Sequence, residues 1–124
     1  MEDGEAAALQ MINENCAATA VQAVNDRVGV GSAQALLKQG LKIPQDISIV
    51  GFGNILIGEY FSVPLTTVRQ PKFRLGVAAM ETMQELLAGR RPEPKRLSAE
   101  LRVRASSGTA PATEPIKRLK TKAI

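Results

Sequence analysis

The chain has 124 residues, of which 44% are apolar and 23% are charged, as in an ordinary soluble domain. It contains no histidine, which excludes histidine-based zinc sites and the Ser-His and Cys-His catalytic pairs. Cys16 is the single cysteine, so no internal disulfide can form and no cysteine-based metal cluster exists. We therefore expect a protein that is not an enzyme, with no catalytic residue, no metal and no cofactor.

The net charge of +4 is unevenly distributed along the chain. Residues 1–89 carry 6 basic and 9 acidic side chains, a net charge of −3, whereas residues 90–124 carry 10 and 3, a net charge of +7. This excess predicts a basic, disordered tail over residues 109–124 or, as the alternative, a segment that attracts polyanions. No apolar run approaches about 18 residues, and the N-terminus is acidic where a secretory signal is basic. We expect no membrane span and a cytoplasmic location.

The first half of the chain predicts a helix followed by a strand-helix-strand unit. Asp3 is a candidate cap for a helix over residues 4–15. Residues 19–24 form a short β-branched run that predicts a strand, and apolar residues then recur at helical spacing over 28–39. Residues 46–52 form a nearly continuous apolar run, as buried parallel strands do. This order predicts a βαβ unit with parallel strands.

The second half predicts two more strands around a long helix. Residues 64–68 read as a third strand, and a helix over 71–88 follows, with an apolar stripe of Phe73, Val77, Met80, Met83 and Leu87. Apolar and polar residues then alternate over 96–104, which predicts an edge strand with one buried face and one wet face. From Ser106 onward the composition is that of a linker or tail.

A glycine-rich loop follows the second predicted strand. Gly53 and Gly58 have the spacing of a phosphate-binding loop, but Gly58 is followed by Glu59 and Tyr60 rather than by lysine and a hydroxyl residue. The negative charge of Glu59 would repel phosphate. A dinucleotide fingerprint would need glycine at position 56, which is Leu56. We therefore reject nucleotide binding.

Polar residues follow all three predicted parallel strands. They are Asn25-Asp26, Gly53-Asn54 and Arg69-Gln70. In open α/β sheets, ligands bind outside the carboxyl ends of the strands. The pattern therefore favours a ligand cleft, although any single one of these residues is also a normal turn residue.

Three segments together resemble the C-terminal part of LacI/GalR-family transcriptional regulators. They are VNDRVGVGSAQALLKQGLKIPQDISIVGFGN, VPLTTVRQPKFRLGVAAMETMQELLAGRRP and ELRVRASSG, within a resemblance that covers residues 17–108. The resemblance implies an α/β fold, a three-layer parallel-sheet subdomain of periplasmic-binding-protein-like type I fold with one edge strand near the C-terminus. It implies a partial effector-binding domain over residues 1–108, without the N-terminal helix-turn-helix and the first subdomain of the family.

The resemblance also implies which residues contact an effector, a sugar or a nucleobase-like molecule. These are Asn25, Asp26, Phe52, Gly53, Asn54 and Gln70. Gly53 stands where many family members carry an aspartate. Four further residues match surfaces that pair subunits in the family, or are simply core: Val30, Ala33, Leu37 and Phe61.

The function implied is that of the effector-sensing and dimerisation portion of a LacI-type regulator. It would form a homodimer or pair with a relative, and operator DNA would be a partner only in the full-length architecture. A non-functional truncated remnant and a sugar-binding component of a transport system are the alternatives. An enzyme would have to use Asp26, Glu59 and Lys72, and nothing in the sequence places them together. The helix over 71–88 would lack its usual partner, so we expect it to fold back on the sheet, pair with another chain or stay mobile.

Overall fold

The structure, a computed structural model, describes residues 1–110. The basic tail expected over 109–124 therefore lies outside the described residues, apart from its first two. The elements in chain order are α1 (Glu2–Asn13), β1 (Ala20–Gln22), α2 (Asp26–Lys38), β2 (Ser48–Phe52), α3 (Leu56–Tyr60), β3 (Thr66–Arg69), α4 (Lys72–Leu87) and β4 (Glu100–Arg102).

The four strands form one mixed sheet in the order β1-β2-β3-β4. The first three strands are parallel, with Val21 opposite Ile49 and Gly51 opposite Thr67. β4 joins the edge of the sheet antiparallel to β3, with Leu101 opposite Val68. The predicted βαβ unit and the edge strand near the C-terminus are both confirmed, and the fold is of the α/β class.

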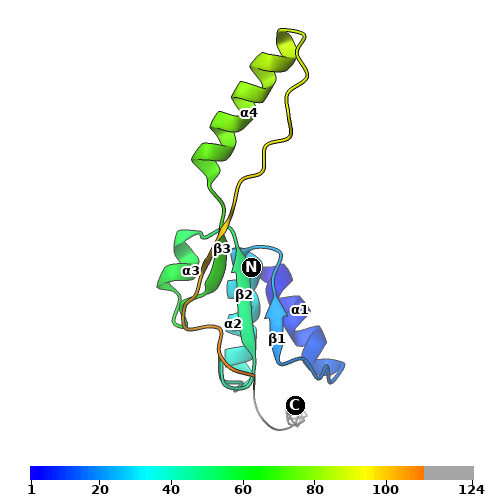
Figure 1. Ribbon diagram of the computed structural model, residues 1–124. Helices are drawn as coiled ribbons and strands as arrows, with labels where there is room; N and C mark the ends of the chain where they lie inside the picture. Colours follow the sequence, from blue (N-terminus) through cyan, green and yellow to red (C-terminus); the bar gives the residue numbers. More distant parts are fainter. Residues whose placement is uncertain (111–124) are drawn as a thin grey trace.

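The core lies between the sheet and α2, which runs behind the sheet in Figure 1. Leu36 of α2 and Ile49 of β2 are fully buried there, together with Leu65 just before β3. Val50 and Phe52, on the opposite face of β2, are by contrast only half-buried. Because alternate residues of a strand face opposite sides, this pattern identifies the face of the sheet that α2 covers.

α1 packs directly on α2 through small residues. The backbone of Gly4 lies against α2, where a Cβ atom at this position would collide with the carbonyl of Val28. The Ser32 hydroxyl donates a hydrogen bond of 2.9 Å to the carbonyl oxygen of Gly4, and Lys38 Nζ lies 3.2 Å from Glu5 Oε1. Small side chains let the two backbones approach closely, so α1 belongs to the folded body.

Two predicted helix starts differ from the structure. α1 begins at Glu2 and Met1 is its N-cap, so Asp3 lies within the first turn instead of capping the helix. α2 begins at Asp26, two residues earlier than predicted, because the side chain of Asn25 accepts a hydrogen bond from Val28 N at 3.0 Å. A side-chain oxygen that satisfies a free N–H at a helix start stabilises that start.

α4 and residues 88–99 form an arm that stands away from the sheet (Figure 1). None of the residues of α4 is buried within the described part of the chain, and the side chains of Phe73 and Leu87 are 86% and 81% exposed. The returning segment of the arm, residues 88–99, is tied to α4 by Lys95, whose Nζ lies 2.7 Å from Glu81 Oε2. The helix therefore does not fold back on this sheet. Among the helices of residues 1–110, none has both the length and the apolar composition needed to cross a membrane.

The predicted edge strand over 96–104 is too long, and its buried face is absent. β4 forms only over Glu100–Arg102, and all three residues are exposed, Leu101 by 59%. The reason is that residues 96–99 leave the sheet with the arm. Of the apolar face that the alternation predicted, Ala99, Leu101 and Val103 are exposed, and Leu97 is half-buried beside α4.

The prediction that a linker begins at Ser106 is also wrong. Ser106 is fully buried. Its hydroxyl accepts a hydrogen bond from Thr66 N at 2.8 Å and donates one to the carbonyl oxygen of Ile49 at 2.6 Å. Its own carbonyl accepts from Ile49 N at 2.7 Å. Ser106 therefore joins β2 and β3, and it returns the chain to the body after the arm.

Candidate functional site

The loop after β2 is held by its own backbone N–H groups. Gly53 N donates to the carbonyl oxygen of Val68 at 2.9 Å, and Ile55 N donates to Asp26 Oδ2 at 2.7 Å. Between them, Asn54 N donates to Thr67 Oγ1 at 3.3 Å. A phosphate-binding loop needs such N–H groups directed at the ligand. Here these three point into the protein, which agrees with the rejection of nucleotide binding.

Asp26 is the residue around which this loop is organised. It is 1% exposed, and besides Ile55 N its carboxylate accepts a hydrogen bond from the hydroxyl of Thr67. It therefore links the start of α2, the loop after β2 and the strand β3. Gly51 makes the room for it, because a Cβ atom at this position would collide with the Asp26 carboxylate and with Leu65.

Arg104 fixes the side chain of Asn54. Its guanidinium donates to Asn54 Oδ1 at 2.9 Å and to the carbonyl oxygen of Leu65 at 2.8 Å, and it lies 3.4 Å from Glu59 Oε2. The oxygen of the Asn54 side chain is thereby occupied, so its NH₂ group, a donor, is the part that remains for other contacts. No sequence pattern indicates this role, because Arg104 is one polar position of a predicted alternating strand.

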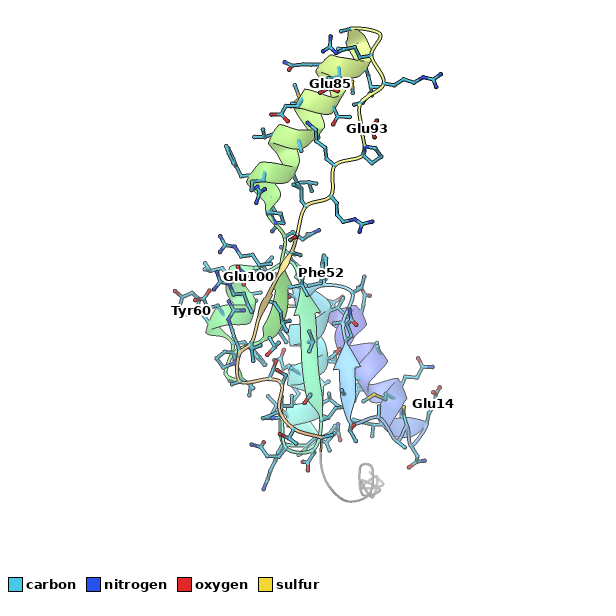
Figure 2. All side chains as sticks on the ribbon, viewed as in Figure 1. Glu14, Phe52, Tyr60, Glu85, Glu93 and Glu100 are labelled. Atoms are coloured by element: carbon cyan, nitrogen blue, oxygen red, sulfur yellow. The ribbon has the colours of Figure 1, made fainter. Side chains whose placement is uncertain are left out.

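A hollow of about 500 Å³ lies at the carboxyl ends of β2 and β3, where the arm leaves the sheet. Figure 2 shows Phe52 and Glu100 at this junction, below the arm that carries Glu85 and Glu93. Two strand ends, the first turn of α4 and the returning segment form its walls. The lining residues are Gly53, Asn54, Arg69, Gln70, Pro71, Lys72, Phe73, Arg74, Ser98 and Glu100.

The hollow brings together three of the six residues predicted to contact an effector. Gly53 and Asn54 come from the end of β2, and Gln70 follows β3. The other three are not among its lining: Asn25 caps α2, Asp26 is buried beneath the loop, and Phe52 is half-buried on the sheet. The predicted strand ends thus meet at one place, but two of the predicted contacts have structural roles here.

Seven lining residues are not among the predicted contacts, and four of them lie on the arm. Lys72, Phe73 and Arg74 belong to the first turn of α4, and Ser98 to the returning segment. In the sequence, the sign of a role for Lys72, Phe73 and Arg74 was that they follow Gln70 and Pro71. Within residues 1–110, no three His, Cys, Asp or Glu side chains gather as a metal site would require.

The backbone at Gly53 differs from that of an ordinary residue. Gly53 has φ +122° and Asn54 has φ +51°. A residue with a side chain rarely adopts the first value, whereas asparagine tolerates the second. An aspartate, which the family resemblance places at position 53, would be strained in this loop.

The four predicted dimer residues lie in or against the core. Val30 and Ala33 are each 1% exposed, and Leu37 and Phe61 are half-buried and packed against the same cluster. In this arrangement Val30 and Ala33 present almost no side-chain surface to a partner. Their role in pairing stays a prediction.

This fold, with a hollow at the carboxyl ends of its parallel strands, is that of a periplasmic binding protein-like domain, whose family model matches residues 1–107. The chain belongs to this family and, within it, contains part of the effector-binding domain of a LacI-type regulator.

Two curated relatives illustrate the similarity. The chain is 47% identical over 79 residues to the HTH-type transcriptional repressor PurR of Vibrio atlanticus (strain LGP32), a match that covers 64% of this chain and 24% of the relative. It is 42% identical over 82 residues to the ribose operon repressor of Haemophilus influenzae (strain ATCC 51907 / DSM 11121 / KW20 / Rd), covering 66% and 25%. The chain thus spans about a quarter of the length of these relatives.

Solved structures of transcriptional regulators are also similar to this chain. The lac repressor dimer bound to operator and the anti-inducer ONPF has a TM-score of 0.76 at 28% identity, over 84% of this chain and 37% of that one. The regulator CelR in complex with cellobiose has a TM-score of 0.76 at 28% identity, over 86% and 33%. The regulator CcpA of Lactococcus lactis has a TM-score of 0.75 at 31% identity, over 86% and 40%.

Proposed function

We propose that the chain is an effector-sensing portion of a LacI-type transcriptional regulator. The observation that carries the proposal is the hollow at the ends of β2 and β3, where Gly53, Asn54 and Gln70 meet. Parallel α/β sheets bind ligands at this edge. The relatives support the same role, since they are transcriptional repressors and two of the similar structures contain a bound anti-inducer or cellobiose.

The hollow supplies the means to recognise a small polar molecule. Gln70, Ser98 and the NH₂ group of Asn54 are neutral hydrogen-bonding groups, and Pro71 and Phe73 are apolar. A few polar groups on a partly apolar wall are typical of small-molecule sites. In our proposal the effector is a sugar or a nucleobase-like molecule that contacts both the sheet and the arm, and binding changes how the arm is held.

The proposal places the chain in the cytoplasm, where transcription is regulated, as part of a subunit pair. One similar structure is a dimer on operator DNA. We propose that operator DNA is read by the longer architecture and that this chain contributes sensing and pairing. An enzymatic role has less support, because the carboxylate of Asp26 is buried and engaged by two donors, away from Lys72 in the hollow.

Thermal unfolding tests the proposal. The purified chain is melted with ribose, cellobiose, sucrose and a set of nucleobases at millimolar concentration. A ligand that binds only the folded state raises the melting temperature. We expect a rise with at least one compound, and loss of that rise in the double variant Asn54→Ala/Gln70→Ala. The control is Gln34→Ala, an exposed position on α2 outside the hollow.

Two results would count against the proposal. A cooperative melt that no compound shifts would remove the sensing role. A broad, non-cooperative melt would instead favour the truncated remnant.

A further inference from the structure

The hollow at the base of the arm has an excess of positive charge. Among its described lining residues, Arg69, Lys72 and Arg74 are basic and Glu100 is acidic. Glu100 is already engaged, since its Oε2 lies 3.2 Å from Arg102 and 3.9 Å from Arg69. None of the salt bridges among residues 1–110 involves Lys72 or Arg74. Two cations therefore face the hollow without an acidic partner in the described chain.

The neutral groups of the hollow add donors to these charges. The Asn54 side chain has its oxygen occupied by Arg104 and retains its NH₂ group. The first turn of α4 contains no acidic residue, and Pro71 at its N-cap makes no side-chain cap hydrogen bond. Its positive dipole end is thus left uncompensated at the wall of the hollow. The ligand that complements such a wall is rich in acceptors and negatively charged.

Resting on the function proposed above, we infer that the hollow takes a small anionic ligand, a phosphorylated sugar. Its phosphate lies against Lys72 and Arg74, where two cations replace the hydration of the anion with charge-assisted hydrogen bonds. Its hydroxyl groups face Asn54, Gln70 and Ser98. A hollow of about 500 Å³ has room for a molecule of this size.

Matched pairs of ligands test the inference on the whole chain. Binding of glucose, ribose and the phosphate monoester of each is measured by calorimetry, with gluconate and inorganic phosphate as further probes. We expect each monoester to bind at least about tenfold more tightly than its neutral sugar. The reason is that a hydrogen bond to a charged group is stronger than a neutral one, by a free energy that corresponds to roughly a tenfold gain in affinity. The advantage decreases as salt is added, because both cations are exposed.

A charge-matched pair of variants assigns the effect to the hollow. Lys72→Gln/Arg74→Gln removes both unpaired cations, and the preference for the monoester is expected to disappear. Both side chains are exposed, so the melting temperature without ligand stays unchanged and shows that the variant folds. The control is Lys42→Gln, an exposed cation before β2, which leaves the preference intact.

The other outcomes separate this inference from the function on which it rests. Equal affinity for a sugar and its monoester, with loss of both in Asn54→Ala/Gln70→Ala, overturns the anionic class and keeps the sensing role. Gluconate binding as tightly as the monoesters overturns the choice of phosphate. If inorganic phosphate binds as tightly as the monoesters, the hollow holds an adventitious ion only, and the inference of a phosphorylated sugar is overturned. Absence of binding by the sugars, their monoesters and the nucleobases overturns both proposals.

Discussion

Asp26 shows how one buried residue can hold a loop that lines the hollow without lining it itself. It is buried with two hydrogen-bond donors, Ile55 N and the Thr67 hydroxyl, that come from different elements. A carboxylate buried in this way is stabilised only while its donors remain in place. The rest of the loop, with Gly53 and Asn54 at the hollow, takes its position from this anchor.

Replacement of Asp26 by alanine is expected to lower the free energy of unfolding by about 2–4 kcal/mol, because two donors lose their acceptor and a buried space opens. Chemical denaturation measures the change. Asp3→Ala, at an exposed position in the first turn of α1, is the control and is expected to change it by less than about 1 kcal/mol. Equal effects of the two variants would show that Asp26 does not anchor the loop.

A pair of glycine variants tests the packing around the same carboxylate. Gly51→Ala is expected to destabilise the fold by about 1–3 kcal/mol, because its Cβ atom would collide with Asp26 and Leu65. Gly76→Ala, in the interior of α4 with no atom near its Cβ position, is expected to stabilise by up to about 1 kcal/mol. Thermal melts of both variants measure the changes. Destabilisation by Gly76→Ala would contradict the open environment of α4.

Among the elements, α4 differs most from the rest because it has the apolar stripe of a packed helix but remains exposed. Met80 and Met83 are half or more exposed, and the helix touches the body only near its start. Its order depends on its own hydrogen bonds and on the returning segment beside it. We therefore expect α4 to open more readily than α2 or the sheet.

Leucine truncations in two helices measure this difference. Leu36→Ala, at a fully buried position of α2, is expected to lower the free energy of unfolding by about 2–5 kcal/mol. Leu87→Ala, at the exposed end of α4, is expected to change it by less than about 0.5 kcal/mol. Denaturant titration of both variants gives the two values. A large loss with Leu87→Ala would mean that α4 is covered in solution, by its own sheet or by a second chain.

The sequence predicted most elements because their patterns are local. The apolar run over 46–52 and the helical spacing over 28–39 each depend on near neighbours, and both elements formed close to their predicted bounds. The predictions were wrong where contacts between residues far apart in the chain determine the structure. The exposed β4 depends on where the arm runs, the buried Ser106 on two strands far away in the chain, and the role of Arg104 on a loop 50 residues earlier. The sequence pattern also predicted that the strand ends would meet. It did not predict that Asn25 would cap α2 or that Asp26 would anchor the loop after β2.

At the scale of the whole molecule, we propose that sensing and DNA reading belong to different parts of a longer architecture. The chain spans 20% to 33% of the length of its curated relatives. Residues 1–89, which contain every element except β4, carry a net charge of −3. In our account the hollow joins body and arm, so a ligand there can change how the two are held.

The chain alone is therefore expected to give no footprint on the operators of its relatives. Any DNA binding should be weak and lost as salt rises, because it would come from the basic residues after 89. Nuclease protection assays at two salt concentrations test this expectation. A defined footprint that survives salt would require a DNA-reading surface within the chain itself.

Backbone amide chemical shifts test the central claim, that the hollow is the effector site, most directly. Spectra of the chain are compared without ligand and with the compound that raises its melting temperature most. Our account predicts that the largest shifts occur at Gly53, Asn54, Gln70 and Lys72, while Lys42, at the opposite end of the sheet, remains unchanged. If the largest shifts occur at residues outside the hollow, the claim that the hollow is the effector site is contradicted.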